Sequence, residues 1–109
     1  MKKEAAKTES TRAILQNWPT NCEPKAVGEK VTQNLLHRKI YVNANGYMVY
    51  PEVCAGFGAL RFADTAGDWE SWQQLLNRYA MIVTPEGRKM ISPERHVDFH
   101  VFGVLPLEM

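Results

Sequence analysis

The sequence has few cysteines, no long apolar run and almost no net charge. Only two cysteines, Cys22 and Cys54, occur among its 109 residues, and they form no Cys-x-x-Cys pair. Two such cysteines exclude the disulfide framework on which many small secreted domains rely. Thirteen basic residues stand against 12 acidic ones, which creates no field that would collect nucleic acid. No apolar stretch approaches the roughly 20 residues of a membrane span, so we expect neither a nucleic acid nor a membrane as a partner.

The beginning of the chain also lacks a secretory signal. Its basic first residues are followed at once by a polar run instead of an apolar one, so the chain as written is expected to be cytoplasmic. Pro19 and Pro24 interrupt the weak helical pattern of this region. We interpret residues 1–24 as a poorly packed N-terminal arm. Residues 25–109 then form one domain, because this length supports no second one.

Helical periodicity dominates the rest of the sequence. Apolar residues recur every three or four positions over about 25–38 and again over about 69–83. A third helix is expected over about 51–65. Gly67 suits the end of that helix and Asp68 suits the N-cap of the next, which predicts an antiparallel αα-hairpin. The expected fold class is therefore all-α, built from αα-hairpins.

The spacing also predicts whether several side chains of these helices are buried or lie at a helix end. Glu52 lies in a first helical turn, where its charge complements the helix dipole. Cys54 lies in an apolar stretch and is expected to be a small buried hydrophobe. Trp69 and Trp72 share a stripe with leucines, so we expect core positions for them in preference to sugar-stacking platforms.

Residues 40–50 carry three tyrosines around an Asn-Gly turn. The pattern leaves open a short β-hairpin and an irregular loop. Exposed tyrosines in a loop are candidates for ligand contact, although a structural role is the commoner one. The three residues are Tyr41, Tyr47 and Tyr50.

One cluster mixes titratable groups of different types, His96-x-Asp98-x-His100. On an extended strand all three side chains face one side, and two imidazoles with a carboxylate are able to bind a divalent metal. The plainer alternative is a capping aspartate flanked by surface or packed histidines. A third interpretation places Asp98 at a helix entrance in a concave site.

Three segments resemble the N-terminal part of glycoside hydrolases of families 88 and 105, the unsaturated uronyl and rhamnogalacturonyl hydrolases, especially those of Bacteroides-like bacteria. The segments are residues 50–60, Ala66-Gly67-Asp68, and His96-Val97-Asp98 with the following Gly103-Val104-Leu105-Pro106-Leu107-Glu108. His-Val-Asp followed by Gly-x-x-Pro-Leu-Glu is the most specific piece. The similarity covers about residues 25–109.

The resemblance implies a fold, a reaction and site residues. The family fold is an α/α barrel of six helical hairpins, of which this chain would form a part. The family hydrates the C4=C5 double bond of an unsaturated uronic acid, and an aspartic acid protonates that bond. Asp98 matches the first of two important aspartates, while Tyr50 and His96 match positions near the sugar. The second aspartate, which is the principal general acid/base in the family, has no counterpart in this sequence, and the resemblance implies no cofactor and no metal.

The expected function is therefore that of a truncated glycoside hydrolase-like domain that is inactive alone. It would take an oligosaccharide with an unsaturated uronic acid only as part of a complete domain. The alternative is a small helical module that binds itself or a partner through exposed apolar helix faces, without catalysis. Members of the family are often periplasmic or exported, whereas this sequence shows no signal peptide.

Overall fold

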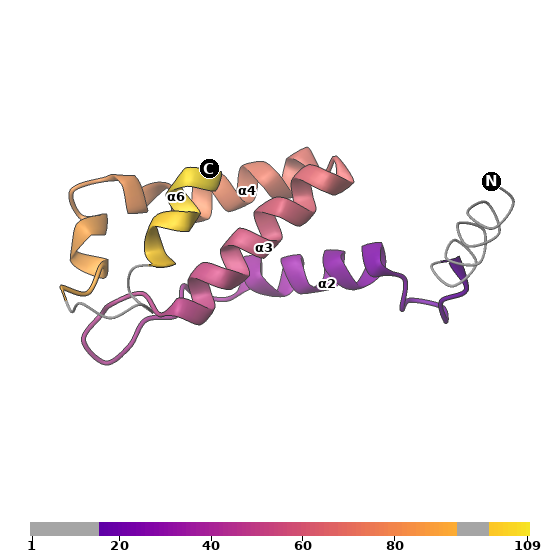
Figure 1. Ribbon diagram of the computed structural model, residues 1–109, viewed down its shortest axis with the longest axis horizontal. Helices are drawn as coiled ribbons and strands as arrows, with labels where there is room; N and C mark the ends of the chain where they lie inside the picture. The colour runs from indigo at the N-terminus through magenta and orange to yellow at the C-terminus, as the bar shows by residue number, and fades with distance from the viewer. Residues whose placement is uncertain (1–15, 94–100) are drawn as a thin grey trace, which may run out of the picture.

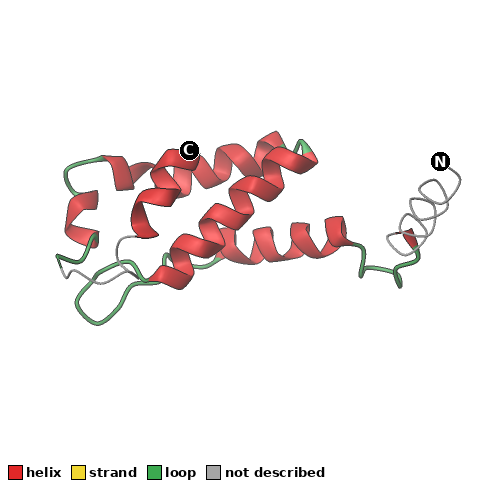
Figure 2. Ribbon diagram, in the orientation of Figure 1, coloured by secondary structure: helices red, strands yellow, loops and turns green. Residues whose placement is uncertain are grey.

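The computed structural model describes residues 16–93 and 101–109, and this part of the chain is mostly helical (Figure 2). Within those residues there is no β-strand, and Val42 and Met48 form an isolated antiparallel bridge. None of the helices described has both the length and the apolar character needed to cross a membrane. The elements are α2 (Pro24–His37), α3 (Tyr50–Ala66), α4 (Trp69–Tyr79), the 3-10 helices η1 (Ala80–Val83), η2 (Gly87–Met90) and η3 (Val101–Gly103), and α6 (Val104–Glu108).

Helices α3 and α4 run antiparallel and are joined by two residues (Figure 1). Gly67 ends α3 with a left-handed backbone, φ 67°, and its N–H donates to the carbonyl of Asp64. Asp68 caps α4, because its carboxylate accepts the backbone N–H of Ser71 at 3.1 Å and the Ser71 hydroxyl at 2.7 Å. These two hydrogen bonds lower the pKa of Asp68. The predicted hairpin and both of its signals are confirmed.

Helix α2 packs against both helices of the hairpin, and α6 packs against α3. The C-terminus of α2, the N-terminus of α3 and the C-terminus of α4 lie at one end of the bundle, opposite the turn at Gly67 (Figure 1). We call this the open end of the hairpin. Residues 38–49 connect α2 to α3 there, and the backbone N–H of Met48 donates to the carbonyl of Met90 at 2.8 Å.

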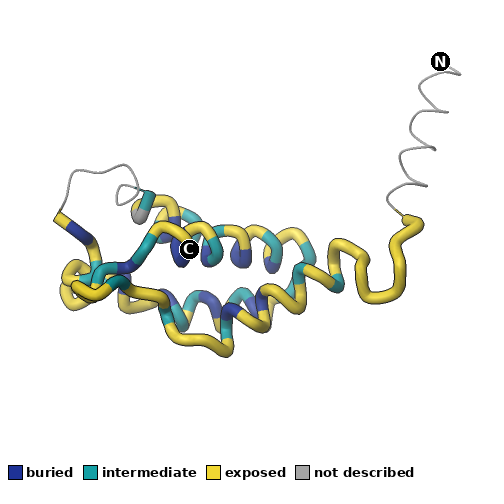
Figure 3. The backbone as a smooth tube through the Cα atoms, turned by 90° about the horizontal axis from the view of Figure 1, so that it is seen from below, coloured by how far each residue is buried: buried dark blue, intermediate teal, exposed yellow. Residues whose placement is uncertain are grey.

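The core lies between these helices, whose buried positions face one another (Figure 3). One close approach explains a glycine inside α3. A Cβ atom on Gly56 would stand 2.8 Å from the ring carbon Cζ of Tyr79, so glycine is needed for the two helices to pack this closely. The buried apolar side chains are those of Leu35, Met48, Val53, Ala59, Leu60, Ala63, Leu75, Tyr79, Ile82 and Leu105.

Two expectations about side chains were wrong. Cys54 is exposed, because the buried face of α3 runs through Val53, Gly56 and Leu60 on the other side of the helix. Trp69 is 63% exposed.

The position of Trp69 follows from the orientation of α4. The buried face of this helix runs through Ser71, Leu75 and Tyr79. Trp72 lies at the border of that face and is partly buried, whereas Trp69 lies beyond it. The apolar stripe was therefore identified correctly, but its centre lies to one side of both tryptophans.

Candidate functional site

Of the three site residues that the family resemblance implies, the structure describes one, and it lies at the open end of the hairpin. Tyr50 begins α3, and it is 48% exposed. His96 and Asp98 lie outside the described residues, as does His100. The element that follows that stretch, η3, packs against α3. The structure thus brings the segment after Asp98 onto the helix that Tyr50 begins.

The connection between α2 and α3 contains no β-strand, but its turn is closed by the isolated antiparallel bridge between Val42 and Met48 and by a 2.8 Å hydrogen bond from the Asn43 N–H to the carbonyl of Tyr47. The side-chain oxygen Oδ1 of Asn43 accepts the backbone N–H groups of Asn45 and Tyr47, both at 3.0 Å. Gly46 has a positive φ of 81°, as a tight turn requires. The loop presents Tyr41 to solvent beside the start of α3.

A buried carboxylate forms the centre of the open end. Glu52 is 1% exposed, and its oxygen Oε1 accepts hydrogen bonds from the Tyr79 hydroxyl and from Nη2 of Arg78, both at 2.8 Å. Its other oxygen, Oε2, accepts the backbone N–H of Tyr41 at 3.2 Å. A second cation, Arg38, places Nη2 at 3.9 Å from Oε2. We call these residues the Glu52 network.

The pKa values of Arg78 and Tyr79 are both raised within this network. The Arg78 side chain is 9% exposed, and its guanidinium also donates to the carbonyl of Arg38. Burial lowers the pKa of Arg78, but the hydrogen bonds with Glu52 and Tyr79 outweigh it and raise that pKa above its ordinary value. Burial raises the pKa of Tyr79 to about 12. Arg78 is therefore charged and Tyr79 neutral at physiological pH, which suits a structural clamp better than a proton-transfer site.

Sequence reasoning missed this network, since it gave Glu52 only a dipole role. The sequence did contain a signal that could have predicted this network. In an antiparallel hairpin centred on Gly67, the first turn of α3 faces the last turn of α4, where Arg78 and Tyr79 stand.

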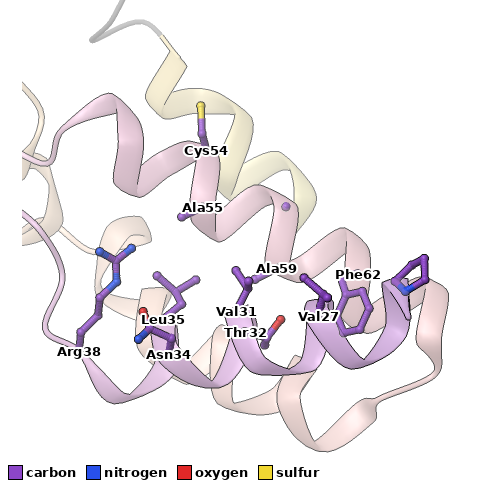
Figure 4. A pocket seen from close by; sticks show the side chains of 13 residues that line it. Val27, Val31, Thr32, Asn34, Leu35, Arg38, Cys54, Ala55, Ala59 and Phe62 are labelled. Atoms are coloured by element: carbon purple, nitrogen blue, oxygen red, sulfur yellow. The ribbon is translucent and has the colours of Figure 1, made fainter. Parts of the chain in front are cut away.

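A hollow of about 410 Å³ lies between α2 and α3 (Figure 4). Val27 and Val31 on α2 line one wall, and Ala59 and Phe62 on α3 line the other. A second hollow of about 380 Å³ adjoins it at Pro24 and Phe62. We call the two hollows together the α2/α3 groove.

Within residues 16–93 and 101–109, no three side chains of His, Cys, Asp or Glu gather where they could hold a metal ion. The sequence cluster around Asp98 lies outside that part of the chain, so the metal alternative for it stays a hypothesis.

Comparisons of the chain with protein-family models, with curated proteins and with solved structures find no match. The relationship to glycoside hydrolases of families 88 and 105 therefore stays a prediction based on the quoted motifs.

Proposed function

We propose that this chain is a helical-hairpin portion of an α/α-barrel hydrolase of the unsaturated uronyl type. In this proposal Asp98 is the first of the two aspartates of the site, and Tyr50 and His96 line the sugar pocket. The observation that supports it is the α3–α4 hairpin, which carries Tyr50 at its open end and holds η3 against α3. Within the described residues, the segments that carry the family resemblance thus belong to this hairpin and to the elements η3 and α6 that pack against α3.

The proposed chemistry also explains why the chain should be inactive alone. Protonation of a C=C bond requires a carboxylic acid whose pKa is raised, and a closed, partly apolar pocket provides that environment. Tyr50 is about half exposed, so the described part of the chain does not enclose its ring. The second aspartate of the family has no counterpart in this sequence.

Titration with a 4,5-unsaturated uronyl disaccharide tests the proposal. The isotope-labelled chain is followed by NMR, and turnover is followed by the ultraviolet absorbance of the double bond. We expect millimolar binding that shifts the signals of the first turn of α3, and no loss of absorbance. The Tyr50→Ala variant should lose these shifts, because an exposed aromatic ring provides a stacking surface for the sugar.

Trp69→Ala is the matched control, since it removes an exposed aromatic ring at the turn end of the same hairpin. It should leave the shifts unchanged, and a saturated disaccharide should produce smaller ones. The proposal fails if the unsaturated sugar shifts no signal near Tyr50, or if Tyr50→Ala and Trp69→Ala behave alike.

A further inference from the structure

The α2/α3 groove is an apolar surface that no described element covers. Val27 and Val31 are 45% and 63% exposed along its α2 wall. A side chain added at Gly58 would meet open space on the α3 wall. Figure 4 shows the two valines projecting from α2 toward Ala59 and Phe62. Side chains of this kind lose contact with water when another apolar surface covers them, which drives association.

Basic side chains mark both ends of this groove. Of the described residues that line it, Lys25 and Arg38 are the only charged ones. They are separated by about 20 Å along α2, at 1.5 Å of rise per residue. Lys25 also lies within electrostatic reach of Asp68, and Arg38 lies near Glu52. Both cations nevertheless remain open to solvent and able to meet an anion.

Three candidates for filling the groove differ in charge: a second copy of the chain, the first 15 residues of the chain, and an acidic helix of another protein. In an antiparallel two-fold pairing of two copies through this groove, Lys25 of one chain would face Arg38 of the other, and like charges oppose that contact. The first 15 residues of the chain are also unsuited, since their charged residues are Lys2, Lys3, Lys7 and Arg12 against only Glu4 and Glu9. An acidic helix has the complementary charge.

We propose that the α2/α3 groove docks an acidic amphipathic helix of a partner protein. Apolar side chains at positions i, i+3, i+4 and i+7 of that helix fill the groove between α2 and α3. The small residues Ala55, Gly58 and Ala59 allow its backbone to approach α3 closely. Carboxylates near its two ends pair with Lys25 and Arg38, which a helix of about 14 residues spans. This surface is separate from the proposed sugar pocket and requires no catalysis.

Two matched synthetic peptides of about 16 residues test the charge preference. Both have leucines on one helical face, and their flanking positions are glutamate in one and lysine in the other. Fluorescence anisotropy measures their affinity for the full chain. We expect the glutamate peptide to bind at least about tenfold more tightly, with an advantage that shrinks as salt is added.

Substitutions then locate the binding surface. Val31→Glu places a like charge in the groove and should weaken binding of the glutamate peptide at least about tenfold. Val83→Glu is the control, because Val83 is 69% exposed and does not line the groove. Lys25→Gln and Arg38→Gln should each weaken binding about two- to fivefold, as expected for exposed charge pairs.

The two exposed cysteines give a second readout on the unmodified chain. Cys54 lines the groove, whereas Cys22 does not, so the bound glutamate peptide should slow alkylation of Cys54 and leave Cys22 unchanged. Equal affinity of the two peptides, or full binding by the Val31→Glu variant, overturns the proposal. Protection of Cys54 without peptide also overturns it. In that case the groove is occupied by a second copy of the chain if the protection of Cys54 rises with the concentration of the chain, or by a segment of the same chain if it does not.

Discussion

The substitution Glu52→Gln tests whether the buried network holds the open end of the hairpin together. Glutamine has nearly the same shape as glutamate, so packing is preserved while one negative charge is removed. Arg78 is then left as a cation that is 9% exposed, and its remaining charged neighbour, Arg38, is also a cation. The expected loss of stability therefore reports on the charge pairing and not on a cavity.

The magnitude follows from the contacts of the network. Breaking a buried ion pair by removing one partner costs about 3–5 kcal/mol. The new amide keeps an oxygen that accepts from Tyr79 or Arg78, and Arg78 keeps its hydrogen bond to the carbonyl of Arg38. We therefore expect the lower limit, about 3 kcal/mol. This is a large share of the roughly 5–15 kcal/mol that stabilises a typical domain.

Urea unfolding followed by far-ultraviolet circular dichroism measures this difference. For an m-value of about 1.5 kcal/mol per molar, the midpoint should fall by about 2 M. Glu29→Gln is the matched control, because Glu29 is an exposed carboxylate on α2, and it should change stability by less than about 0.5 kcal/mol. If Glu52→Gln and Glu29→Gln unfold at the same midpoint, the charge pairing of the Glu52 network contributes nothing to stability.

Two further predictions concern the same helix pair. Gly56→Ala should destabilise the chain by about 1–3 kcal/mol, because the added methyl group pushes on the Tyr79 ring. Gly58→Ala, two residues along α3, adds its methyl group in open space and should stabilise the chain by about 0.5–1 kcal/mol. Urea midpoints that move in the same direction for the two variants would contradict this packing. Because the pKa of Tyr79 is raised to about 12 in the folded state, the unfolded chain loses the phenolic proton first, so stability should fall as the pH rises from about 10 to about 12. Tyr79→Phe should remove this part of the pH dependence in thermal unfolding, and an unchanged alkaline profile would argue against it.

The helices and their turn could be predicted because their signals are local. Gly67 and Asp68 each act on backbone within four residues, so reading them required no knowledge of the tertiary fold. The loop before α3 was ambiguous because an Asn-Gly turn serves a β-hairpin and an irregular connection equally well. The loop also makes a hydrogen bond from Met48 to Met90, far along the chain, which no local pattern shows.

The candidate site was less predictable because it depends on contacts between distant residues. Glu52 and Arg78 are 26 positions apart, and the pattern around each one is that of an ordinary helical end. Periodicity also identifies the apolar stripe of a helix, but it does not show which edge of that stripe packs against a neighbouring helix. That is why Cys54 and Trp69 were placed in the core and lie at the surface.

The Glu52 network also sets the register of the two helices. Apolar contacts are non-directional, so a hairpin held by them alone tolerates sliding of one helix along the other. A slip of one turn, about 5.4 Å, would carry Glu52 away from both Arg78 and Tyr79 and leave a buried carboxylate without donors. The chain connection fixes the hairpin at Gly67, and directional charged hydrogen bonds fix it at the open end. The α3 wall of the groove is thereby held in a single alignment with its neighbours.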